Sequence, residues 1–170
     1  MRTFIFQGMC YSGKSTLGKK VADSLGMDFL DSRDQFVKVI GDSEINFLNE
    51  HGREKFIEAE KKSLMDDFNG VFSCGGSAVY YDEIMKQLHE KYEIIWLDVD
   101  LKLIKKRKEL EGRVRPIVFP EGINTFDELY HQRSKLYEKY YTHRIRVTEF
   151  ETIEETTKKI LNSLVHNSKN

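Results

Sequence analysis

Apolar residues in this 170-residue chain occur in short runs that alternate with segments of helical periodicity. The clearest run, residues 93–99, is continuous enough to predict a strand buried on both faces. Residues 14–25 instead place Leu17, Val21 and Leu25 four positions apart, which is the spacing of one helix face. The chain therefore alternates two kinds of element.

The same pattern predicts five strands, at residues 3–6, 27–30, 71–74, 93–99 and 143–147. The predicted helices span residues 14–25, 33–67 with breaks near Gly41 and Gly52, 81–91, 101–110, 126–141 and, behind a capping box of Thr152 and Glu155, 152–165. Residues 111–124 contain both prolines and two glycines and predict a loop. Strands that alternate with helices predict an α/β fold with a parallel sheet covered on both faces, in a single domain of residues 1–170.

Composition limits the class of protein. Hydrophobic residues make up 39% and charged residues 32%, which is typical of a globular chain. A net charge of −1 without a basic block argues against a nucleic-acid or membrane-surface binder. Two cysteines without a CxxC pair, and no apolar run long enough for a signal peptide or membrane span, lead us to expect a cytoplasmic location. We also expect a monomer.

Residues 8–15, Gly-Met-Cys-Tyr-Ser-Gly-Lys-Ser, fit the P-loop pattern GxxxxGK[ST]. Glycines let such a loop turn its backbone N–H groups toward a phosphate, and the following helix points its positive end at the same anion. We expect Lys14 to reach the β and γ phosphates of ATP and the Ser15 hydroxyl to bind Mg²⁺. The predicted ATP site comprises Gly8, Cys10, Tyr11, Ser12, Gly13, Lys14, Ser15 and Thr16, with no special chemistry required of Cys10 and Tyr11.

A series of motifs follows the P-loop along the chain: Thr16-Leu17-Gly18, Phe29-Leu30-Asp31-Ser32, Gly52-x-x-x-Phe56 with Glu58 or Glu60 beyond, residues 73–79, Arg113-Val114-Arg115-Pro116, and Arg133-x-x-x-Tyr137. With these motifs the sequence resembles the shikimate kinase family of nucleoside-monophosphate-kinase-like P-loop proteins, over nearly the whole chain. The resemblance implies a five-stranded sheet in the order 2-3-1-4-5, a lid at about residues 111–124 and a substrate-binding helical region at about residues 33–67.

The resemblance also assigns roles on the ATP side. Asp31 matches an acid that lies near Mg²⁺ and its waters, although a helix N-cap would equally explain a carboxylate there. Arg115 matches the lid arginine that reaches the transferred phosphates, or else it is a solvated loop arginine. Arg107 lies near the position of the family's adenine-stacking arginine, or else on a solvated basic helix face.

On the acceptor side, the resemblance places Gly75 and Gly76 against the substrate, unless they only form a tight turn after the strand. Ser77 replaces the third glycine of the family's run, and Arg133 matches an arginine that binds the substrate carboxylate. We therefore expect a small, anionic acceptor.

Two positions break the family pattern. Arg33 stands where the family has a second aspartate, and Ile57 stands where it has a second carboxylate-binding arginine. Arg33 is expected to reach in and replace the lost arginine in part, or to point to solvent. Asp34 is our substitute for positioning the acceptor hydroxyl, with a surface helix acid as the alternative.

The sequence thus predicts an ATP-dependent kinase that phosphorylates a hydroxyl of a small anionic metabolite, with ATP and Mg²⁺ as cofactors. Shikimate is one candidate acceptor, and another polyol or hydroxy acid is at least as well supported by the changes at Arg33 and Ile57. The alternatives are a non-catalytic ATP-binding sensor or partner-binding module, which would not need a lid arginine, and a nucleoside or nucleotide kinase, which would need a longer acceptor region.

Overall fold

The computed structural model of the chain describes residues 2–112, 117 and 119–166. Its centre is a parallel sheet in the order β2-β3-β1-β4-β5. The strands are β1 (Phe4–Gln7), β2 (Phe29–Asp31), β3 (Val71–Ser73), β4 (Glu93–Val99) and β5 (His143–Val147). The predicted α/β class and the strand order implied by the family resemblance are both confirmed.

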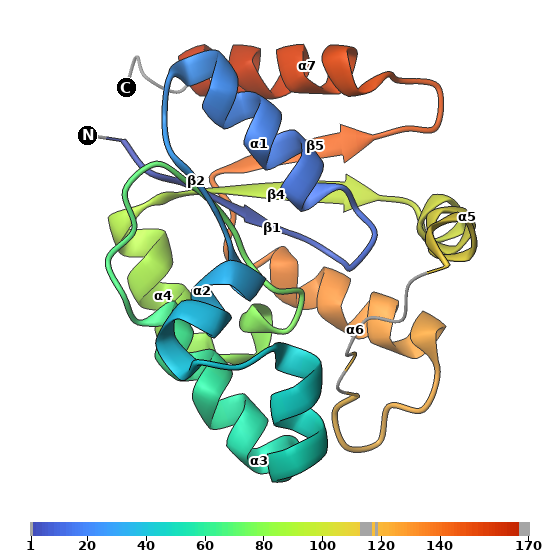
Figure 1. Cartoon of the computed structure of the whole chain (residues 1–170). Helices are drawn as coiled ribbons and strands as arrows, with labels where there is room; N and C mark the ends of the chain where they lie inside the picture. Colours follow the sequence, from blue (N-terminus) through green and yellow to red (C-terminus); the bar gives the residue numbers. More distant parts are fainter. Residues whose placement is uncertain (1, 113–116, 118, 167–170) are drawn as a thin grey trace.

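Helices cover both faces of the sheet. Helices α1 (Lys14–Leu25) and α7 (Ile153–His166) contact each other over one face, whereas α4 (Asp82–Lys91) and α6 (Phe126–Tyr137) lie on the other (Figure 1). The remaining helices are α2 (Ser32–Ile40), α3 (Glu44–Leu64), α5 (Leu101–Glu111) and the 3-10 turn η1 (Ala78–Tyr80). No helix in the described part of the chain is long and apolar enough to cross a membrane.

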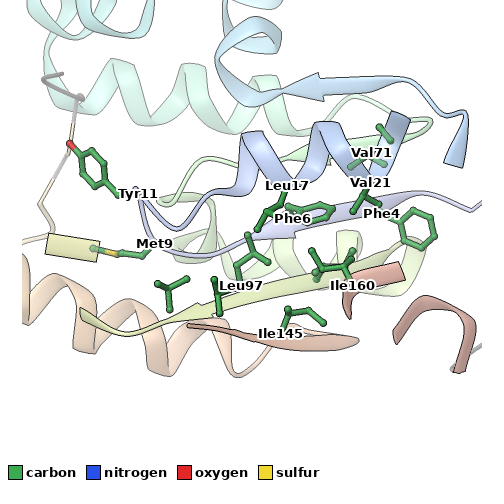
Figure 2. Packing of buried hydrophobic residues seen from close by; sticks show 14 of the residues in the cluster. Phe4, Phe6, Met9, Tyr11, Leu17, Val21, Val71, Leu97, Ile145 and Ile160 are labelled. Atoms are coloured by element: carbon green, nitrogen blue, oxygen red, sulfur yellow. The ribbon is translucent and has the colours of Figure 1, made fainter. Parts of the chain in front are cut away.

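The sheet separates two apolar clusters. Phe4 and Phe6 of β1 pack with Leu17 and Val21 of α1 on one face, as Figure 2 shows. Ile5, which lies between the two phenylalanines, belongs to the cluster on the opposite face. Successive side chains of a strand point to opposite faces, so a continuous apolar run requires helices on both sides.

The helical region predicted at residues 33–67 is two helices, broken at the expected glycines. Gly41 caps α2 in the left-handed conformation (φ 85°), and Gly52 adopts a non-helical conformation (φ 78°, ψ 176°) inside α3. Both glycines take positive φ values at little cost because they lack a Cβ atom.

The helix predicted at residues 126–141 was too long, because α6 ends at Tyr137. The buried side chain of Gln7, on β1, donates hydrogen bonds to the carbonyl oxygens of Tyr137 and Tyr140. These contacts hold the chain in a turn that leads into β5. On the other side of the predicted lid, α5 extends to Glu111, and residues 113–116 and 118 lie outside the described residues. The lid itself remains a prediction.

Gly70 fixes the start of β3 against the end of the α1–β2 loop, and its replacement tests that contact. A Cβ atom on Gly70 (φ 113°) would lie 2.4 Å from the carbonyl oxygen of Asp28, which already accepts from the Val71 amide at 2.8 Å. We expect Gly70→Ala to lower the free energy of unfolding by about 3 kcal/mol in urea denaturation.

The matched control is Gly26→Ala, because Gly26 also has a positive φ (64°) but no atom lies within 4 Å of the added methyl group. That variant should lose only about 1–2 kcal/mol, the cost of a left-handed backbone. Equal losses in the two variants would contradict the predicted clash with Asp28.

Candidate active site

The loop between β1 and α1 closes around the side chain of Lys14. Lys14 is 9% exposed, and its ammonium group donates to the carbonyl oxygens of Gly8 and Met9, both at 2.8 Å. Gly8 (φ 145°) must be a glycine, since a Cβ atom there would lie 2.9 Å from the carbonyl oxygen of Leu97. Helix α1 begins at Lys14, so its positive end and an ammonium group face the same space. This arrangement suits a phosphate.

Tyr11 has a structural role that its variable position in the motif did not indicate. Among the described non-glycine residues, it alone has a positive φ (65°). Its ring is buried and lies 6.5 Å from the ring of Phe126, centroid to centroid, at the start of α6. A left-handed backbone costs such a residue about 1–2 kcal/mol, which burial of the ring offsets.

A cavity of about 750 Å³ lies at the carboxyl ends of the strands. The cavity is lined by the loop that holds Lys14, by the end of β2, by the segment after β3 and by parts of α5, α6 and α7. The structure thereby brings together most of the residues predicted for the site: Cys10, Tyr11, Ser12, Gly13, Lys14, Ser15, Thr16, Asp31, Arg33, Gly75, Gly76, Ser77, Arg107 and Arg133.

Ser15 and Asp31, the two predicted metal ligands, are in contact. The Ser15 hydroxyl donates to the Asp31 carboxylate at 2.5 Å, and Asp31 also caps α2 by accepting from the Arg33 amide at 3.1 Å. Both interpretations of Asp31, N-cap and site acid, are therefore compatible. A hydroxyl and a carboxylate side by side suit Mg²⁺, which takes few protein oxygens and completes its shell with phosphate and water.

Arg33 binds the same carboxylate. Its Nε lies 3.0 Å from Asp31 Oδ1, and its side chain is 44% exposed while that of Asp31 is 8% exposed. Burial raises the pKa of Asp31, but the hydrogen bonds from Arg33 and Ser15 outweigh burial and hold that pKa below its ordinary value. The carboxylate is thus ionised and already paired with a cation.

Arg133 of α6 also lines the cavity and is only 3% exposed. Its Nε donates to the Tyr80 hydroxyl at 3.3 Å, and its guanidinium lies 5.2 Å from the centroid of the Tyr80 ring. A Cβ atom on Gly76 would lie 2.9 Å from Arg133 Nη1, so the absence of a side chain at Gly76 leaves room for the guanidinium. Tyr137 donates to the Gly76 carbonyl at 2.8 Å, and its ring lies 6.2 Å from that of Trp96.

Glu60 is the buried acid that the sequence left unresolved. Glu58 is exposed, whereas Glu60 is 7% exposed, lines the cavity and accepts from Ser77 Oγ at 2.5 Å and from the Tyr81 hydroxyl. Burial raises the pKa of Glu60, and the two hydroxyls and the charge of Arg133 reduce that rise without cancelling it. Ser77 therefore acts through its side chain rather than through backbone contact alone.

Arg107 of α5 contacts the P-loop. Its Nη1 donates to the carbonyl oxygens of Ser12 at 3.1 Å and Tyr11 at 3.4 Å, and burial lowers its pKa. It lines the cavity, so the solvated-face alternative does not describe it. The cavity is also lined by the end of β5, the segment that follows it and the start of α7, which the sequence did not assign to the site: Val147, Glu151, Thr152, Ile153 and Thr156.

Several predicted residues do not line the cavity. Gly8 contributes only its carbonyl to Lys14. Asp34 is exposed on the first turn of α2, and the side chain of Ile57 packs against the cluster that contains Ile5. Arg115 lies outside the described residues. The part of the chain that the structure describes has no cluster of three or more His, Cys, Asp or Glu residues suited to a metal.

Comparison with known proteins points to one family. A family model described as shikimate kinase matches residues 11–165. The shikimate kinase of Clostridium botulinum (strain Loch Maree / Type A3) is 31% identical over 147 residues, which cover 84% of this chain and 86% of that protein. That of Persephonella marina is 31% identical over 140 residues, or 81% and 84% of the two chains. The structure of shikimate kinase from Acinetobacter baumannii in complex with shikimate has the same fold, with a TM-score of 0.83 at 21% identity over 100% of this chain and 96% of that one.

Removal of one donor to Glu60 should give a pH-dependent loss of stability. A raised pKa in the folded state means that folding is favoured when Glu60 is protonated, and that this contribution is lost as pH rises through the folded pKa. Tyr81→Phe deletes one hydroxyl that stabilises the carboxylate, so it should raise that pKa further. We expect a loss of about 1.5–3 kcal/mol at neutral pH and a smaller loss near pH 5.

Urea denaturation at the two pH values measures the difference, with Tyr141→Phe as the control because Tyr141 is 38% exposed. A loss from Tyr81→Phe that does not change with pH would contradict the role assigned to Glu60.

Proposed function

Because this chain belongs to the shikimate kinase family, we propose that it transfers the γ-phosphate of ATP to a hydroxyl group of a small hydroxy acid, a class that includes shikimate. The coarser activity follows from membership: the chain is an ATP-dependent small-molecule kinase that phosphorylates an alcohol. The acceptor class rests on Arg133, which lines the cavity.

In this proposal, the phosphates of ATP lie in the loop of residues 8–15. Lys14 would exchange its contacts with Gly8 and Met9 for contacts with the β and γ phosphates. Ser15 and Asp31 would hold the Mg²⁺ used by kinases of this family, which neutralises charge on the phosphates when bound. Arg107, against the P-loop carbonyls, would face the rest of the nucleotide.

The residues provide positioning and electrostatic stabilisation rather than strong base catalysis. The transition state of phosphoryl transfer is loose and asks little of a base, so the exposed position of Asp34 does not count against activity. Asp34 as the residue that orients the acceptor and Arg115 as the lid arginine remain predictions, as do the cytoplasmic location and the monomeric state.

Arg133 carries the assignment of the acceptor. Its guanidinium lines the cavity and is almost fully buried, yet among the described residues it forms no ion pair with a carboxylate. Glu60 acts on it only electrostatically, and the raised pKa of Glu60 weakens that compensation. Arg133 contacts uncharged groups of Tyr80, and a buried charge without an anionic partner is costly, so an anionic group of the acceptor would complete the site.

The experiment on the acceptor compares a carboxylic acid with its neutral analogue. We expect turnover, measured as ATP consumption, with shikimate or gluconate, and little with shikimate methyl ester or glycerol. The kcat/KM for the acid should exceed that for the ester by roughly 30-fold or more, since an unpaired buried charge costs about 2–5 kcal/mol. Arg133→Gln should reduce this preference, whereas the exposed Arg53→Gln on α3 should keep it.

Equal turnover of the acid and the ester would contradict the anionic acceptor. ATP binding in calorimetry without turnover on any acceptor would contradict the kinase proposal for this chain and favour a nucleotide-binding sensor.

A further inference from the structure

Arg33 contacts the carboxylate of Asp31, one of the two predicted Mg²⁺ ligands. Asp31 accepts from Arg33 Nε at 3.0 Å and from Arg33 Nη2 at 3.5 Å, while Ser15 donates to its second oxygen at 2.5 Å. The hydroxyl and carboxylate oxygens that suit a metal are therefore committed to each other and to a guanidinium.

A guanidinium and a divalent cation repel each other if both contact one carboxylate. Mg²⁺ also demands near-octahedral geometry with short oxygen distances, which leaves little room for a second cation on Asp31. Asp31 is buried, with 8% of its side chain exposed, so it cannot turn outward to serve both partners. Arg33 can move instead, because its side chain is 44% exposed.

The mobile partner lies in the right place to act on an acceptor. Arg33 stands on the first turn of α2 and lines the cavity together with Glu44 and Phe56 of α3. Glu44 and Asp34 both act on its guanidinium electrostatically, so the side chain has acidic neighbours on α3 and on its own helix. A guanidinium released from Asp31 stays at the cavity and regains its capacity to bind an anion.

We propose that Arg33 is a specificity-determining residue that is released by the nucleotide: it neutralises Asp31 until Mg²⁺ arrives with the nucleotide, and then binds the anionic group of the acceptor. Mg²⁺ binding and acceptor binding are thereby coupled through one side chain. The binding of the acceptor by Arg33 rests on the proposed function, whereas the exchange between Arg33 and Mg²⁺ at Asp31 does not.

The exchange is tested without any acceptor. Calorimetric titration with ADP at a series of Mg²⁺ concentrations gives the Mg²⁺ concentration at which the ADP affinity is half-maximally enhanced. In Arg33→Gln this concentration should fall about fivefold or more, because no guanidinium has to be displaced. Arg53→Gln removes one arginine charge from an exposed site on α3 that does not line the cavity. This control variant should leave the half-maximal Mg²⁺ concentration unchanged.

An unchanged or higher Mg²⁺ requirement in Arg33→Gln would overturn the exchange. So would an equal fall in Arg53→Gln, which would indicate a general effect of net charge. Circular dichroism and urea unfolding of each variant establish that it is folded.

The binding of the acceptor by Arg33 is tested with shikimate as the probe. We expect shikimate to bind about fivefold or more tightly when a non-hydrolysable ATP analogue and Mg²⁺ are present than when they are absent, and we expect Arg33→Gln to lose this enhancement. Equal affinity in both states, or an enhancement that survives in Arg33→Gln, would overturn the acceptor role. Failure of shikimate to bind in either state would overturn both the acceptor role and the shikimate-type acceptor of the proposed function, while the ADP titration would still decide the exchange.

Discussion

The parallel register of the five strands is the constraint on which the site depends. Because all neighbouring strands run in the same direction, their carboxyl ends meet at one edge of the sheet, and the loops that follow them converge there. The P-loop follows β1, Asp31 ends β2, and Gly75 to Ser77 follow β3. A change of direction in any one strand would move its loop to the opposite edge, so the fold and the binding chemistry cannot be separated.

Charges around the cavity are held by polar neighbours that a ligand can replace. Lys14 contacts two carbonyl oxygens, Asp31 contacts a hydroxyl and a guanidinium, and Glu60 accepts from two hydroxyls. Arg133 contacts a tyrosine ring and its hydroxyl instead of a carboxylate. Such groups are oriented before a ligand binds, which reduces the ordering that binding must pay for.

Residues 8–15 could be predicted one by one, because the geometry of a P-loop is local and its glycines are required by the backbone. Glu60 could not be separated from Glu58, since which of them faces the cavity depends on how α3 rotates after the kink at Gly52. The contact of Arg33 with Asp31, two residues before it, depends on the direction of a side chain on the first turn of α2, and the burial of Tyr11 against α6 is a tertiary contact; motif spacing reports neither. Local chemistry was therefore predictable, and side-chain direction on the helices was not.

The packing of Tyr137 gives the protein an internal optical reporter. Trp96 is the single tryptophan of the chain, is 3% exposed, and lies against both Tyr137 and the guanidinium of Arg144. Tyr137 is in turn hydrogen-bonded to Gly76, beside the guanidinium that we assign to the acceptor. Events at Gly76 and Arg133 are thus two contacts away from the indole, so the emission of Trp96 reports on the site without an added label.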